Sequence, residues 1–209
     1  MGTNPIGRKV QLALLAALAA AMALAGLGHV SAAQASTRSA PPSAVDVYRQ
    51  LLTKPIRASA LPPGFGRAAV NASAGSARAR RHHSVGAVVV TLNKPPDLTL
   101  GSLSYVVYPS RSDALAGTLP FPAPPGRSIT HLTLSGAFLR GSQLVTSSIV
   151  RNLAGKTFQF TFVQVALIDG NVAIAAATIA PSPGAAGQVL KTVALAEFAQ
   201  ARLATVRRS

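Results

Sequence analysis

The segment Arg78–His83 (RARRHH) gathers three arginines and two histidines immediately ahead of an apolar run. Clustered cations bind polyanions, because they contact phosphate or carboxylate groups and release the counterions around them. The candidate anion-binding residues are Arg78, Arg80, Arg81, His82 and His83. A metal site on the two histidines is disfavoured, because adjacent strand residues point to opposite faces of a sheet. The alternative, which the arginine-rich composition favours, is a solvated surface loop.

A second candidate site is an apolar pocket with aromatic walls. Tyr105 and Tyr108 share one predicted strand, Phe121 lies in a proline-rich bend, and His131 and Phe138 follow along the chain. Ligand pockets are lined mainly by apolar and aromatic side chains, with a few polar groups among them. These residues are therefore candidates for a binding pocket, and a plain hydrophobic core is the simpler alternative.

Few side chains are available for acid–base catalysis. The chain has five acids and four histidines, one of which, His29, lies near the amino terminus. Only Asp97 falls in a predicted loop without a structural role, so paired-carboxylate chemistry has almost no residues available. No nucleophile elbow, H-E-x-x-H, phosphate-binding loop or dinucleotide-binding glycine motif occurs. We assign no catalytic residue, cofactor or metal. A secreted hydrolase that uses a serine, His131 and Asp97 stays open, because triads assemble in space rather than in sequence.

The amino-terminal segment has the composition of a secretory signal peptide. Arg8 and Lys9 precede the apolar run Leu12–Leu27, and Ala33–Ala35 supplies the small residues of a cleavage site. We expect cleavage after Ala35. The alternative is an uncleaved membrane anchor, but a membrane-spanning helix needs about 20 apolar residues and this run is shorter. The chain contains no cysteine, which excludes disulfides, thiolate catalysis and lipoprotein acylation.

The charge of the chain narrows the choice of partners. The net charge is +15, and loss of Arg8 and Lys9 with the signal peptide leaves +13 on the mature chain. Such a surface attracts an anionic envelope polymer or a lipid surface. Nucleic acid is not expected, because the basic cluster lacks aromatic side chains for stacking and the protein is predicted to be exported. The abundance of Arg, Ala and Gly is typical of GC-rich bacteria, so we expect a secreted or extracytoplasmic bacterial protein.

The predicted organisation is a signal peptide over 1–35, a flexible tail over 36–42 and a single α+β domain over 43–209. We expect an antiparallel sheet of five or six strands, with a long C-terminal helix packed on one face and shorter helices at the edges. The predicted strands are Val85–Leu92, Leu103–Tyr108, Ile129–Leu134, Leu144–Leu153 and the two arms of Thr157–Ile179. The predicted helices begin at Ser43, Ser110 and Gln188, and the predicted loops include Asn71–Arg81 and Asn93–Gly101.

The hairpin Thr157–Ile179 is the strongest structural signal. Asp169-Gly170 between two apolar runs predicts a tight turn, which would pair Leu167 with Val172. Both faces of the hairpin are apolar, so a layer should cover each of them. The expected floor under the C-terminal helix is the flat row Ala173, Ala175 and Ala177.

The C-terminal helix, Gln188–Arg207, carries apolar residues around much of its circumference. Val189 and Val193 face one way, whereas Leu195 and Phe198 face nearly the opposite way. Such a helix lies between two layers, or it uses its second side to form a homodimer. The sequence as a whole favours an exported, non-catalytic domain that binds a partner or a ligand, with the secreted hydrolase as the alternative.

Overall fold

The computed structural model describes residues 42–94, 97–121, 127–134, 142–153, 156–181 and 185–209. The expected signal peptide and most of the expected tail lie outside these residues. The described residues belong to one compact unit, Pro42–Ser209. Among them, no helix is both long enough and apolar enough to cross a membrane.

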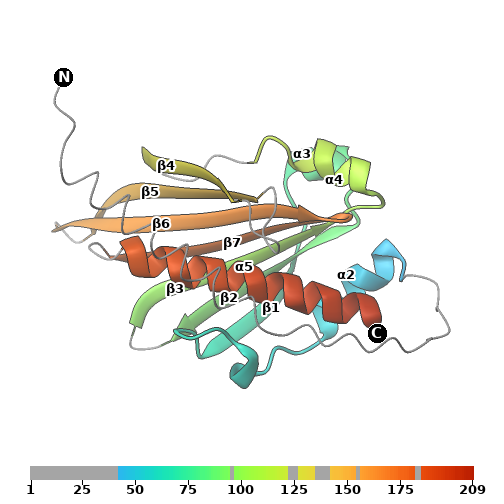
Figure 1. The fold of residues 1–209 in the computed structure, drawn as a ribbon, viewed down its shortest axis with the longest axis horizontal. Coiled ribbons are helices and arrows are strands. Elements are labelled where there is room, and N and C mark those ends of the chain that lie inside the picture. Colours follow the sequence, from blue (N-terminus) through green and yellow to red (C-terminus); the bar gives the residue numbers. More distant parts are fainter. Residues whose placement is uncertain (1–41, 95–96, 122–126, 135–141, 154–155, 182–184) are drawn as a thin grey trace. The chain divides into compact units, whose positions relative to one another are not determined.

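Seven antiparallel strands form one sheet in the order β1-β2-β3-β7-β6-β5-β4 (Figure 1). The strands are β1 (Arg67–Ser73), β2 (Gly86–Lys94), β3 (Asp97–Val107), β4 (Arg127–Leu134), β5 (Ser142–Leu153), β6 (Lys156–Asp169) and β7 (Val172–Pro181). The last strand along the chain, β7, lies in the middle of the sheet, between β3 and β6. The predicted α+β class and antiparallel sheet are confirmed, with one strand more than expected.

The additional strand, β1, lies at an edge of the sheet and pairs only with β2. Most of its side chains are exposed, so no buried face imposes the alternation of apolar and polar residues by which a strand is recognised. The expected loop Asn93–Gly101 is also wrong in its extent. Strands β2 and β3 continue into it, and Lys94 pairs with Asp97.

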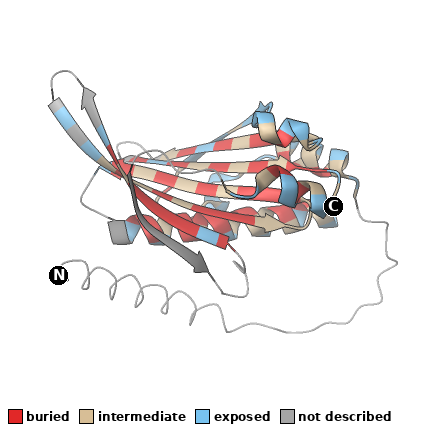
Figure 2. Cartoon of the chain, turned by 90° about the horizontal axis from the view of Figure 1, so that it is seen from above, coloured by how far each residue is buried: buried red, intermediate tan, exposed pale blue. Residues whose placement is uncertain are grey.

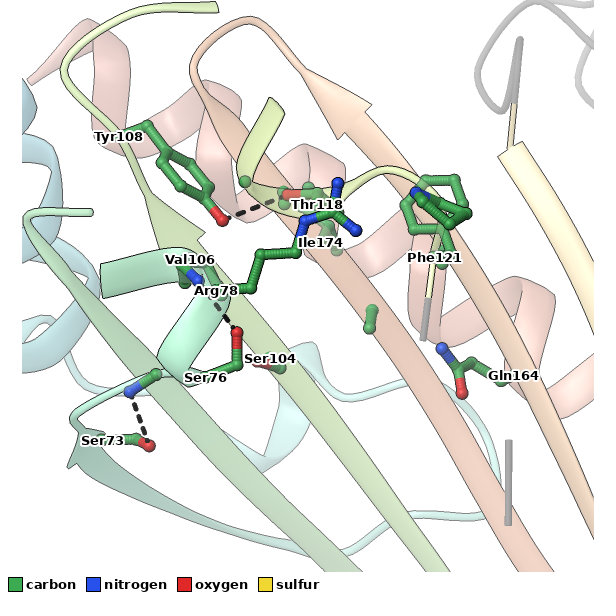
Figure 3. Close-up of a pocket in the computed structure, with 17 residues that line it drawn as sticks. Ser73, Ser76, Arg78, Ser104, Val106, Tyr108, Thr118, Phe121, Gln164 and Ile174 are labelled. Atoms are coloured by element: carbon green, nitrogen blue, oxygen red, sulfur yellow. Dashed lines mark hydrogen bonds between the residues drawn. The ribbon is translucent and has the colours of Figure 1, made fainter. Parts of the chain in front are cut away.

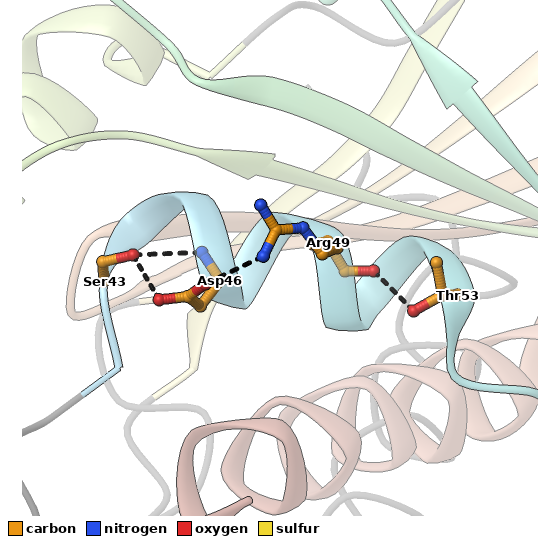
Figure 4. Close-up of polar contacts among 4 residues, drawn as sticks. All are labelled: Ser43, Asp46, Arg49 and Thr53. Atoms are coloured by element: carbon orange, nitrogen blue, oxygen red, sulfur yellow. Dashed lines mark hydrogen bonds and ion pairs between the residues drawn. The ribbon is translucent and has the colours of Figure 1, made fainter.

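Within the described residues, four α-helices accompany the sheet: α2 (Ala44–Thr53), α3 (Ala77–Arg81), α4 (Arg111–Thr118) and α5 (Ala185–Arg208), together with one short 3-10 turn at Ala58–Ala60. The predicted caps are confirmed: Ser43 and Ser110 accept hydrogen bonds from the backbone N–H groups of Asp46 and Asp113. Figure 4 shows Ser43 and Asp46 at the start of α2, where Asp46 also pairs with Arg49. Helix α3 falls within the expected loop Asn71–Arg81, and Ser76 caps it.

Helix α5 packs along one face of the sheet. The Thr178 hydroxyl on β7 lies 2.7 Å from the Thr192 hydroxyl, and the Tyr105 hydroxyl donates to the Ala199 carbonyl at 3.4 Å. The β7 side chains on this face include Ile174 and Ala176, both fully buried. Figure 2 shows the resulting alternation of buried and less buried residues along the central strands.

The row Ala173, Ala175 and Ala177 points to the opposite face, because successive strand residues alternate between faces. Ala175 and Ala177 are only half-buried. The expectation that these alanines form the floor under the C-terminal helix is therefore wrong. The helix needs large side chains to fill the space beneath it, and the β7 side chains on the other face, which include Val172 and Ile174, supply them.

The hairpin turn is one residue later than the sequence suggested. Asp169 pairs with Val172 and Leu167 with Ile174, so the two-residue loop is Gly170-Asn171. Gly170 has φ +56°, and the arrangement is that of a type II′ turn, in which glycine takes the first loop position. The change shifts each cross-strand partner by two residues, so every side chain keeps its predicted face.

Helix α5 is also covered on a second side, by α2 and the segment that follows it. The Arg202 guanidinium donates to the carbonyls of Leu51 and Lys54 at the end of α2, at 2.8 and 2.9 Å. Gly101 lets Phe65 and Leu195 come close, since a Cβ there would lie 2.5 Å from the Phe65 ring. These contacts cover a second side of α5, while Leu190 on the same helix stays exposed.

Candidate functional site

Helices α3 and α4 lie together at one end of the sheet (Figure 1). They pack on Ala173, which points to the face opposite α5. They are held there by a small buried cluster of Ala79, Tyr108, Ala114 and Ala173. Gly117 allows α4 to lie against the Tyr108 ring, because a Cβ at this position would be 2.5 Å from that ring. The Tyr108 hydroxyl then lies 3.2 Å from the Thr118 hydroxyl, which fixes the end of α4.

Beside this cluster is a pocket of about 530 Å³, which we call the Ala175 pocket (Figure 3). It lies between α3, the end of α4 and the exposed sheet face. The residues that line it are Ser73, Gly75, Ser76, Arg78, Ala79, Ser104, Val106, Tyr108, Gly117, Thr118, Pro120, Phe121, Gln164, Ala166, Ala173, Ile174 and Ala175.

The floor of the pocket is apolar and flat. Ala166 on β6, Ala173 and Ala175 on β7, and Val106 on β3 come from three neighbouring strands and share this face. Methyl side chains leave room above the sheet that larger residues would fill. The pocket therefore exists because the alanine row is left partly uncovered, next to helices that do not extend across it.

Polar groups stand at the sides of this floor. Ser104 and Gln164 rise from β3 and β6, and Arg78 reaches over from α3 (Figure 3). The Arg78 Nε donates to the Ala116 carbonyl at 3.1 Å, and one terminal nitrogen donates to the Leu119 carbonyl. The Ala116 carbonyl belongs to the last turn of α4, where helical carbonyls have no helical partner, and Leu119 is the residue that caps this end of the helix. Arg78 thus ties α3 to α4 and places its guanidinium at the pocket.

The remaining members of the Arg78–His83 cluster do not converge on the pocket. Arg80 donates to the Gly75 carbonyl at 2.8 Å, and Arg81 is exposed. His82 closes α3 and His83 adopts a left-handed φ of 58°, as residues after a helix end often do. The helical turn spreads these side chains around α3, whereas a shared anion site would need them on one side.

The predicted aromatic pocket is divided by the sheet. Tyr108 lines the Ala175 pocket, but Tyr105 lies on the opposite face, fully buried beneath α5. Burial raises the pKa of Tyr105 well above its ordinary value, and the nearby charge of Arg202 offsets only part of this rise. Phe138 lies outside the described residues. His131 pairs with Val145 along β4, and its side chain is likewise outside them.

The described lining of the pocket contains no histidine, aspartate or glutamate. Three acids have structural roles instead: Asp46 and Asp113 at helix caps, and Asp169 in an ion pair with Arg207 at 2.7 Å. Among the described residues, no three histidines or acids come together as a metal site. The chemistry available at the pocket is apolar contact, hydrogen bonding and one cation.

Sequence reasoning missed the alanine floor, Ser104 and Gln164. Gln164 carries a signal, because it is a polar residue inside the apolar run Val163–Leu167. A polar side chain in such a run points either to water or to a polar feature of a site. Only the packing of α3 and α4 decides which of these applies.

Comparison with known protein families and with curated proteins gives no match. Two solved structures show a distant likeness. The extracellular domain of PknH from Mycobacterium tuberculosis has a TM-score of 0.35 and 9% identity, over 69% of this chain and 84% of that chain. A protein from Bacteroides thetaiotaomicron has a TM-score of 0.32 and 13% identity, over 60% of this chain and 40% of that chain. Likeness at this level carries no functional argument.

Proposed function

We propose that the mature protein is an exported, non-catalytic binding domain that takes a small, largely apolar ligand into the Ala175 pocket. The observation that carries this proposal is the alanine floor beside the α3–α4 pair. Its volume of about 530 Å³ falls within the range of roughly 300–1,000 Å³ that is usual for small-molecule sites. If no ligand used this face, we would expect larger side chains to cover a row of alanines in the middle of a sheet.

The lining supports binding rather than turnover. Apolar residues supply the floor, and Ser104, Gln164 and Arg78 offer a few hydrogen-bond donors that would orient a ligand. The part of the lining that the structure describes has no group that would act as a general base. Export is supported by the sequence of residues 1–35, which has the three regions of a signal peptide.

Binding is tested with Nile red, a neutral dye that fluoresces in apolar surroundings. Wild-type protein should give saturable fluorescence. Ala175→Phe fills the pocket and should abolish most of it, whereas Ala201→Phe, on the exposed side of α5, should bind like the wild type. Circular dichroism checks that both variants are folded. Equal binding by the wild type and Ala175→Phe would contradict the proposal.

Treatment of the same protein with a fluorophosphonate probe distinguishes a binding protein from a serine hydrolase. Absence of labelling is the expected result. Specific labelling that is lost on heating would favour a secreted serine hydrolase instead.

Export is tested by the amino terminus of the protein recovered from a bacterial host. Mass spectrometry should find Ser36 first, because cleavage is expected after Ala35. A full-length chain in the membrane fraction would contradict cleavage and would favour the membrane anchor.

A further inference from the structure

We infer that the ligand of the Ala175 pocket is an anionic amphiphile, with its alkyl chain on the alanine floor and its acidic head group on Arg78. This inference rests on the proposed function, since it names the class of ligand for the same pocket. Two independent features carry it: an arginine whose hydrogen-bonding capacity is only partly used, and an apolar surface next to it.

Arg78 is oriented by the protein, and part of its guanidinium stays available. A guanidinium has five N–H donors in a rigid fork. Two donor contacts are made, to the carbonyls of Ala116 and Leu119. Within the described part of the chain, Arg78 forms no ion pair. Figure 3 shows its guanidinium between Thr118 and Phe121, at the side of the pocket. A carboxylate or phosphate placed there would accept the remaining N–H groups.

The surroundings of Arg78 favour an anion. The α3–α4 pair carries Arg78, Arg80, Arg81 and Arg111 but only one acid, Asp113. Asp113 is engaged with Ser110 in the cap of α4. No described acid lines the pocket, so a cation stands beside an apolar floor without an opposite charge. The energy of a charge pair is greater next to such a low-dielectric surface than in open water.

The apolar floor distinguishes an amphiphile from a simple anion. A free phosphate or an acidic polymer would be bound by Arg78 and the exposed arginines without any use of Ala166, Ala173 and Ala175. A neutral lipid would use the floor and leave the Arg78 charge without an anionic partner. A ligand with an alkyl chain and a terminal acid group uses both the floor and Arg78, because the chain is buried on the floor and the acid group pairs with the guanidinium.

The test compares three ligands that share a chain: dodecanoate, dodecyl phosphate and methyl dodecanoate, measured by isothermal titration calorimetry below their aggregation concentrations. The wild type should bind the two anions more tightly than the ester, by about tenfold for a half-exposed charge-assisted pair. Preference for dodecanoate over dodecyl phosphate, or the reverse, identifies a fatty acid or a phospholipid-type head group.

Variants assign the preference to Arg78. Arg78→Gln should abolish the preference for dodecanoate over the ester, and any loss that both ligands share reflects the loss of the bonds from Arg78 to α4. Arg78→Lys should keep a smaller difference, because lysine keeps the charge and loses the fork. Arg111→Gln makes the same charge change on α4 without touching the lining and should keep the full difference.

The outcomes separate this inference from the proposed function. If the ester binds the wild type as tightly as dodecanoate, or if Arg78→Gln keeps the full preference, the anionic head group is wrong and the apolar pocket stands. If Arg78→Gln weakens ester and acid equally, the residue supports the pocket only structurally, and the inference is also overturned. If neither dodecanoate nor the ester binds, and Ala175→Phe behaves like the wild type with Nile red, the proposed function itself fails.

Discussion

Arg207 shows how a single side chain holds two distant segments together. Its guanidinium donates to the Asp169 carboxylate at 2.7 Å, to the Asp169 carbonyl at 2.8 Å and to the Asn171 side-chain oxygen at 3.3 Å. It therefore joins the end of α5 to the turn of the β6–β7 hairpin. A Cβ at Gly170 would lie 2.7 Å from this guanidinium, so glycine serves both the turn and the contact.

Loss of this contact should lower the free energy of unfolding. Arg207→Gln removes an ion pair whose two side chains are each less than one-third exposed, and we expect a loss of about 1–2 kcal/mol. Arg208→Gln is the matched control, because Arg208 is exposed and bonds only within its own helix. Urea unfolding measures both. Equal stability of the two variants would show that the Arg207 contact contributes nothing.

At the scale of elements, the two faces of β7 have different roles. Ala176 is fully buried against α5, while its neighbour Ala175 is half-buried in the floor of the pocket. Ala176→Leu adds volume to a closed contact and should cost about 1–3 kcal/mol. Ala175→Leu adds the same volume to an open face and should cost less than about 0.5 kcal/mol.

Thermal and urea unfolding of this matched pair decides which face α5 covers. Both substitutions replace the same residue type on the same strand, so strand propensity cancels between them. If Ala175→Leu proved to be the more destabilising change, helix α5 would have to lie on the alanine row.

Much of this arrangement could be predicted from the sequence, and the reasons for the failures are physical. Capping serines, prolines and apolar periodicity located α2, α4, α5 and the central strands. The edge strand β1 has no buried face, so periodicity could not indicate it. The apolar character of both hairpin faces required two covering layers, but it could not say which layer covers which face. A row of alanines suits either a closely packed helix or an open pocket.

The candidate site was harder to predict than the fold, because it depends on contacts between distant segments. Ala79, Tyr108, Ala114 and Ala173 meet from four parts of the chain, and the pocket exists only because they meet. Arg78 and Tyr108 were among the predicted site residues and do line the pocket. Tyr105 was predicted with them. It is the strand neighbour of Val106, which faces the pocket, and neighbouring strand residues point to opposite faces, so Tyr105 points to α5.

At the scale of the whole molecule, the charge of +13 expected for the mature chain should produce weak binding to anionic surfaces. Retention on heparin should fall steeply with salt, because screening shortens the range of these charges. The double variant Arg80→Gln/Arg81→Gln should elute at lower salt than Arg49→Gln/Arg208→Gln, which loses the same charge from α2 and α5. Elution of both variants at one salt concentration would show that the α3 cluster has no special contribution.

The most direct test of the Ala175 pocket is a methyl NMR titration of alanine-labelled mature protein with dodecanoate. The methyl signals of Ala166, Ala173 and Ala175 should shift together and saturate, because these groups line the pocket. The signals of Ala176 and Ala199, buried on the α5 side of the sheet, should stay in place. Shifts confined to the α5 side, or no saturable shift at Ala166, Ala173 and Ala175, would contradict a ligand site on the alanine floor.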